Sequence, residues 1–123
     1  MNDDAPAQEP STTAGAAAGR TFDSFELPEP VREGVRAAGF THCTPIQEKT
    51  LPITLEGKDV AGQAQTGTGK TAAFLITLFT RLLEKPRAGR PAAPRALIIA
   101  PTRELVVQIA NDARELGDRK SVV

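Results

Sequence analysis

A chain of 123 residues has room for at most one modest domain, and its 40% hydrophobic content excludes a protein that is disordered throughout. The formal net charge is zero, but residues 31–123 carry 14 bases and 9 acids, a mildly basic balance that permits a polyanionic partner without requiring one. One cysteine and one histidine exclude a disulfide framework and cannot supply a structural zinc site. We see no secretory signal and no apolar run long enough to span a membrane, so a cytoplasmic protein without a membrane partner is the simplest interpretation.

Residues 1–20 form a low-complexity segment of Ala, Gly, Ser, Thr, Pro and a few acids. Such a composition cannot bury enough apolar surface to offset the entropy of ordering, so we expect a disordered tail. A first helix should open around residues 28–30 and run to Ala38, although Gly34 inside it costs roughly 1 kcal/mol relative to alanine. A second helix should start at Thr44-Pro45, and Pro52 should disturb its later part.

The rest of the chain alternates between predicted strands and predicted helices. Residues 59–63 are expected to form a short strand, and residues 70–83 a helix with an apolar stripe. Residues 95–100 form a continuous apolar run typical of a buried parallel strand, followed by a helix over residues 103–116. This order predicts the start of a doubly wound α/β domain with a parallel sheet.

A glycine-rich segment connects the first predicted strand to the helix that follows it. Gly67 and Gly69 allow backbone N–H groups to converge on phosphate oxygens at the positive end of the helix dipole. Lys70 can reach the β- and γ-phosphates of a nucleotide, and Thr71 can ligate Mg²⁺. The competing interpretation is a plain strand-to-helix turn with an exposed lysine. The predicted phosphate-binding set is Ala64, Gln65, Thr66, Gly67, Thr68, Gly69, Lys70 and Thr71.

Two further segments each have a capping interpretation and a binding interpretation. In Thr44-Pro-Ile-Gln47 the spacing is that of a capping box, which would by itself explain both residues. A glutamine amide can also donate to and accept from the edge of adenine, which distinguishes it from guanine. In residues 101–105, Thr102 can cap the last helix and Glu104 suits its first turn without any nucleic acid.

Together these segments resemble the motifs of DEAD-box RNA helicases. Residues 39–47, with Phe22 lying 17 residues before Gly39, resemble the Q motif. Residues 64–71 resemble motif I, in which alanine at the first position is usual, and residues 101–105 resemble motif Ia. The resemblance covers about residues 21–117 and extends more weakly to bacterial helicases associated with RNA degradation complexes.

The resemblance implies the N-terminal portion of RecA-like domain 1, with ATP and Mg²⁺ as cofactors. Phe22 would then stack on the adenine, with Phe25 as the competing aromatic residue, while Gln47 reads the base edge and Thr44 assists. Lys70 and Thr71 would be its catalytic members, and Thr71 its Mg²⁺ ligand. The family's strand-to-helix corner contacts the RNA sugar–phosphate backbone without sequence specificity, which here implies Pro101, Thr102, Arg103 and Glu104. Proteins of RNA-degradation complexes are implied as further partners.

The resemblance also implies what these 123 residues lack. There is no Asp-Glu-Ala-Asp or Ser-Ala-Thr segment, so we expect no ATPase or helicase activity from this chain. The alternatives are a P-loop NTPase of another class and a non-catalytic ATP- and RNA-binding module. Residues 118–123 do not continue the preceding helix, and Gly117 could simply end it. They also match one reading frame of a common sequencing-adapter oligonucleotide, so we expect them to be a non-native extension.

Overall fold

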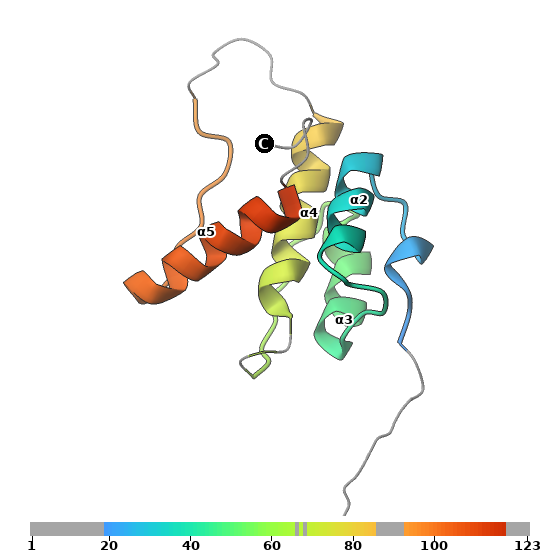
Figure 1. Ribbon diagram of the computed structural model, residues 1–123, viewed down its shortest axis with the longest axis horizontal. Coiled ribbons are helices and arrows are strands. Elements are labelled where there is room, and N and C mark those ends of the chain that lie inside the picture. The colour runs from blue at the N-terminus through green and yellow to red at the C-terminus, as the bar shows by residue number, and fades with distance from the viewer. Residues whose placement is uncertain (1–18, 66, 68, 86–92, 118–123) are drawn as a thin grey trace, which may run out of the picture.

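The computed structural model describes residues 19–65, 67, 69–85 and 93–117, so the predicted tail (apart from its last two residues) and the predicted extension at 118–123 lie outside it. The elements in chain order are η2 (Phe22–Ser24), α2 (Glu29–Ala37), α3 (Pro45–Thr54), α4 (Lys70–Glu84) and α5 (Arg103–Gly117). α4 runs through the middle of the molecule and contacts α2, α3 and α5, with α5 crossing it on the side away from α3 (Figure 1). The four predicted helices are therefore confirmed, with ends within a residue or two of those expected.

The core forms where the apolar stripe of α4 meets its neighbours. Leu75 and Ile76 are fully buried, and Phe79 packs beside them. Leu51 of α3 and Val35 of α2 close the same cluster from the other helices. Burial of this kind contributes roughly 1.5–3 kcal/mol for each large aliphatic side chain, so this cluster is a main source of the stability that holds the helices together.

Gly34, expected to weaken α2, has a packing reason. A β-carbon at this position would overlap the backbone carbonyl oxygen of Leu116 near the end of α5. The two helices therefore cross at a contact that only glycine allows. Leu116 itself is buried there.

The expectation that Pro52 disturbs α3 is wrong, because the helix continues through it to Thr54. Proline removes one backbone hydrogen bond inside a helix. Here the last turn has other supports: Leu51 is completely buried, and the hydroxyls of Thr54 and Thr77 lie 2.7 Å apart in a hydrogen bond to α4. Tertiary packing has thus overridden the tendency of Pro52 to interrupt the helix.

The two predicted strands are the main correction. Residues 59–63 and 95–100 are irregular, and no backbone hydrogen bond joins either of them to another residue in the described ranges. Leu97 and Ile99 are consequently 83% and 84% exposed. An apolar run indicates that a segment suits burial, but a strand also needs neighbours on its edges. The predicted parallel sheet is therefore not formed in this part of the chain.

Candidate functional site

Two glycines of the phosphate-loop segment have a backbone conformation that glycine permits. Gly67 has φ of 83° and Gly69 has φ of 88°, both in the left-handed region that disfavours other residues. Gly69 is the N-cap of α4 and provides no side-chain hydrogen bond to the first turn. No side chain at Gly69 therefore caps the first backbone N–H groups of α4. A helix start that binds an anion needs such uncapped N–H groups. Thr66 and Thr68 lie outside the described residues.

Lys70 binds to its own loop. Its ammonium Nζ donates to the backbone carbonyl oxygen of Ala64 at 2.5 Å, on the exposed side of the molecule. A phosphate oxygen is a stronger acceptor for an ammonium than a peptide carbonyl, because the bond is assisted by charge on both partners. The lysine thus has a weaker internal partner that a nucleotide phosphate could replace. The backbone role of Ala64 could not be foreseen from the sequence.

Gln47 connects α3 to the phosphate loop. It is only 3% exposed. Its Oε1 accepts from the backbone N–H of Thr44 at 2.8 Å, and its Nε2 donates to the carbonyl oxygen of Gly69 at 3.1 Å. The capping box is therefore confirmed, and the same amide also touches the residue that begins α4. One N–H and one lone pair of the amide are not used by these two bonds.

Gly69 is required for this contact as well as for its positive φ. A β-carbon there would overlap Nε2 of Gln47 and come within 3.3 Å of Oγ1 of Thr44. Gln47 and Thr44, the two polar residues predicted to lie near the base, thus both lie against Gly69. The structure brings these three predicted site residues together.

Phe22 is buried and does not present its ring to solvent. Its ring stacks on that of Phe40, with centroids 6.0 Å apart and planes inclined by 30°. Phe40 is 38% exposed and lines the same groove as the phosphate loop. Phe40 was not among the predicted site residues, although it directly follows Gly39 in the predicted Q motif. Phe25, the competing aromatic residue, is buried in the core cluster.

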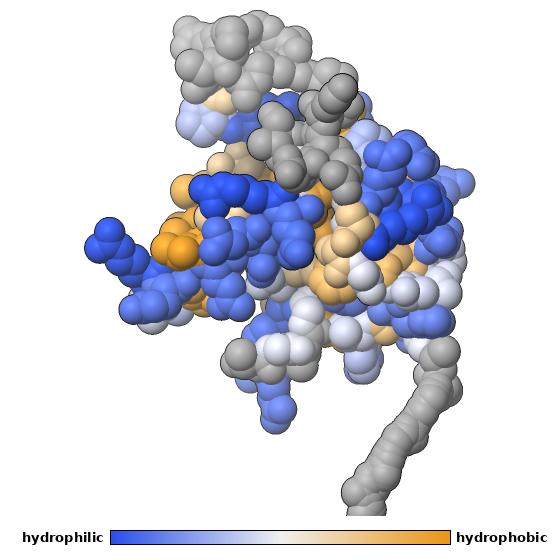
Figure 2. Space-filling view, viewed as in Figure 1, coloured by the Kyte–Doolittle hydropathy of each residue, from blue (hydrophilic) through white to orange (hydrophobic). Residues whose placement is uncertain are grey.

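A groove of about 930 Å³ is lined by both the phosphate loop and the corner before α5. Gly67, Lys70 and Thr71 line it from one segment, and Pro101 lines it from the other. Figure 2 shows apolar side chains gathered where the 95–101 segment meets α5, and among the exposed apolar residues are Leu97, Ile98, Ile99, Val106 and Val107. The groove is therefore polar at the phosphate loop and apolar along much of its length.

The RNA-binding prediction falls on the exposed start of α5. Oγ1 of Thr102 accepts from the backbone N–H of Leu105 at 3.2 Å, so the capping interpretation is confirmed. Arg103 and Glu104 are exposed in the first turn. Their side chains are open to a partner, and whether RNA is that partner stays a prediction.

The single thiol is not reactive in this setting. Burial raises the pKa of Cys43 to about 11, and the nearby Glu48 carboxylate adds to the rise while Arg20 opposes it. A protonated thiol is a poor nucleophile and a poor metal ligand. Within the described ranges no three His, Cys, Asp or Glu residues gather closely enough to hold a metal ion. The same ranges hold no helix with the length and apolar character of a membrane span.

Comparison with known proteins identifies the family. The sequence profile described as DEAD/DEAH box helicase matches residues 44–123, more than half of the chain. The chain belongs to this family. The match includes residues 64–71 and 101–105, and residues 44–47 at the end of the predicted Q motif, on which the resemblance rested.

The most similar curated relatives include bacterial proteins named ATP-dependent RNA helicase RhlB. The one from Xanthomonas oryzae pv. oryzae is 58% identical over 99 residues, which cover 79% of this chain and 17% of the relative. The one from Sodalis glossinidius is 60% identical over 100 residues, covering 80% and 24%. The chain therefore spans less than a quarter of the length of these relatives.

Solved structures agree with the assignment. The RNA helicase Prp28 from Chaetomium thermophilum bound to ADP has a TM-score of 0.73 and 42% identity, over 82% of this chain and 24% of that one. A DEAD box protein from Methanococcus jannaschii has a TM-score of 0.70 and 33% identity, over 81% and 26%. The packing of the helices is thus that of DEAD-box helicase structures, even though the sheet is not formed here.

Proposed function

We propose that this chain is the adenine- and phosphate-binding portion of an ATP-dependent RNA helicase, with ATP and Mg²⁺ as its ligands. The observation that carries the proposal is the position of Gln47. Its buried amide bonds both to Thr44, in the same segment, and to Gly69, in the phosphate loop. A residue able to read a base edge is therefore held against the residues able to hold phosphates.

The local chemistry fits a nucleotide. The first-turn amides of α4 and the Lys70 ammonium would bind the phosphates, and the Thr71 hydroxyl would contribute one ligand to Mg²⁺. The second N–H and lone pair of Gln47 would pair with the adenine edge. Phe40 belongs to the same predicted Q motif as Gln47, and its ring stacks on that of Phe22. Magnesium would neutralise the phosphate charge when bound, and the chain's own residues would orient the nucleotide.

RNA is the proposed second ligand. The exposed first turn of α5, with Thr102 and Arg103, can donate to phosphate and sugar oxygens without reading the base sequence. Relatives named ATP-dependent RNA helicase support this proposal for the whole protein. Action in the cytoplasm and association with RNA-degradation complexes belong to the same proposal.

The chain itself is proposed to be catalytically inactive. Its 123 residues contain no Asp-Glu-Ala-Asp segment, and phosphoryl transfer depends almost entirely on positioned groups. Purified chain should therefore show no RNA-stimulated ATP hydrolysis above background. Turnover that disappears in Lys70→Ala would contradict this.

Titration with labelled ADP and GDP tests the central proposal. We expect the chain to prefer ADP, and we expect Lys70→Ala to lose most of its affinity for both nucleotides. Equal affinities for ADP and GDP would reject adenine recognition and favour a P-loop NTPase of another class. Unchanged ADP affinity in Lys70→Ala would reject the phosphate loop.

A further inference from the structure

A short segment at the start of the described chain runs antiparallel to the beginning of the predicted Q motif. We call residues 19–22 the strap. The Arg20 carbonyl accepts from the backbone N–H of Cys43 at 2.8 Å, and the Phe22 N–H donates to the carbonyl of Thr41 at 3.0 Å. Thr21 and His42 form the bridge between these two bonds. The strap thus ends in the aromatic ring that the proposed function places near the base.

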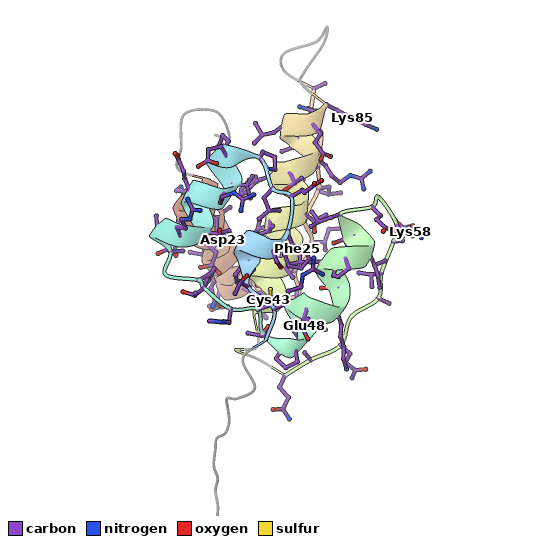
Figure 3. The ribbon with its side chains drawn as sticks, turned by 90° about the vertical axis from the view of Figure 1, so that its right-hand side faces the viewer. Asp23, Phe25, Cys43, Glu48, Lys58 and Lys85 are labelled. Atoms are coloured by element: carbon purple, nitrogen blue, oxygen red, sulfur yellow. The ribbon has the colours of Figure 1, made fainter. Side chains whose placement is uncertain are left out.

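Glu48 holds the other end of the strap. Its Oε2 accepts from the backbone N–H of Arg20 at 2.6 Å, a bond strengthened by the negative charge of the acceptor. The approach is close: a β-carbon on Gly19 would lie 2.6 Å from the carbonyl oxygen of Cys43 and 3.4 Å from the same carboxylate oxygen. Figure 3 shows Glu48, Cys43 and Phe25 on one face of the molecule.

The side chain of Arg20 extends this attachment to the core. Its guanidinium carbon lies 3.8 Å from the centre of the Phe25 ring, and its Nε donates to Oγ of Ser24 at 2.7 Å. The Ser24 hydroxyl in turn donates to the carbonyl of Thr21 at 2.6 Å. The backbone between Glu48 and Phe22 therefore has little freedom to change direction.

We propose that Glu48 is a positioning residue for nucleotide recognition: by holding the Arg20 amide it fixes the strap, and thereby the Phe22 ring against Phe40. Glu48 directly follows Gln47 in α3, so one helical turn carries both the amide proposed to read the base edge and the carboxylate that places the aromatic pair. The proposed role needs no contact between Glu48 and the nucleotide. This inference rests on the proposed function.

Two phosphate ligands, ADP and inorganic tripolyphosphate, distinguish a role of Glu48 in base recognition from a general loss of structure. ADP would use both the base site and the phosphate loop, whereas inorganic tripolyphosphate would use the phosphate loop alone. Removing a hydrogen bond to a charged group changes an equilibrium by about fivefold to tenfold when the group is exposed. We expect Glu48→Ala to lower the affinity for ADP by that factor and to leave the affinity for tripolyphosphate unchanged.

Three further variants complete the experiment in the full chain. Glu48→Gln keeps an acceptor for the Arg20 amide and should recover most of the ADP affinity. Gly19→Ala forces the strap away from Cys43 and should reproduce the selective loss of ADP through a different atom. Glu56→Ala removes an exposed acid that pairs with Lys58 just beyond α3, and should behave as the wild type.

The outcomes discriminate between the two proposals. If wild type shows no preference for ADP over GDP, the proposed function fails and this inference fails with it. If wild type prefers ADP but Glu48→Ala binds it equally well, only the positioning role is overturned. An equal loss of ADP and tripolyphosphate in Glu48→Ala, without recovery in Glu48→Gln, would show a structural role and overturn it too.

Discussion

Replacing Gly34 by alanine sets two effects against each other in α2. Alanine inside a helix is favoured over glycine by about 1 kcal/mol, so local propensity alone predicts a more stable protein. The new β-carbon would overlap the carbonyl oxygen of Leu116, however, and backbone cannot rotate away as a side chain can. The two effects have opposite signs, so the measured sign decides between them.

The packing effect should be the larger. Relieving the overlap requires α2 and α5 to separate by on the order of 1 Å, and a gap of that size forfeits a quarter to a half of the attraction between facing atoms. Overpacking of this kind costs roughly 1–3 kcal/mol. The buried side chains of Val31, Val35 and Leu116 lie in the same cluster and would share the loss. The net expectation for Gly34→Ala is destabilisation by about 1 kcal/mol.

Urea-induced unfolding followed by circular dichroism measures this difference, at one protein concentration throughout. Ala37→Gly is the matched control, because Ala37 is exposed in the last turn of the same helix and reports propensity without a packing change. It should lose at most about 1 kcal/mol. An increase in stability for Gly34→Ala, equal in size to the loss in Ala37→Gly, would refute the close crossing of α2 and α5.

Gln47→Glu keeps an acceptor for the Thr44 amide but loses the donor to the carbonyl of Gly69, so ADP affinity should fall about tenfold or more in calorimetry while the helix content stays unchanged. Wild-type affinity would contradict the role of that donor. Leu97→Ser with Ile99→Ser should shift the chain from self-associated species toward monomer in analytical ultracentrifugation, since both side chains are exposed and apolar. A wild-type chain that is monomeric and unfolds in one sharp transition would disprove this. Because burial raises the pKa of Cys43 from its ordinary value of 9.0 to about 11, the thiol is deprotonated less readily in the folded protein than in the unfolded protein. The free energy of unfolding should therefore have its full value below pH 9 and fall as pH rises from 9 to 11. Replacing the thiol in Cys43→Ala should remove this fall.

The helices and the phosphate loop were predictable because their signals are local. A threonine before a proline, with a glutamine three residues later, specifies a capping box, and the box is present at Thr44. Gly67 and Gly69 permit positive φ values, and both residues adopt them. Each of these features depends on atoms within a few residues of one another.

The features that sequence could not supply depend on contacts between distant segments. Nothing local indicates that Gly34 faces a carbonyl of α5, or that Gln47 reaches the loop carbonyl of Gly69, 22 residues away. The strand prediction at 95–100 was wrong for the same reason, because hydrophobicity does not specify a neighbour for its backbone. Phe40 was missed because its importance comes from stacking on Phe22, across the bridge between Thr21 and His42.

The attachment of α5 is uneven along its length. Buried Ile109, near its middle, and Leu116, near its end, secure the helix, whereas Val106 and Val107 near its start are 48% and 52% exposed. Amide hydrogens in the first turns should therefore exchange through local openings of low free energy, well below that of global unfolding. If RNA binds at Thr102 and Arg103, it binds the end of the helix that is least ordered in advance. Part of the gross binding energy would then be consumed in ordering that end, so affinity for RNA would be lower than the number of phosphate contacts alone suggests.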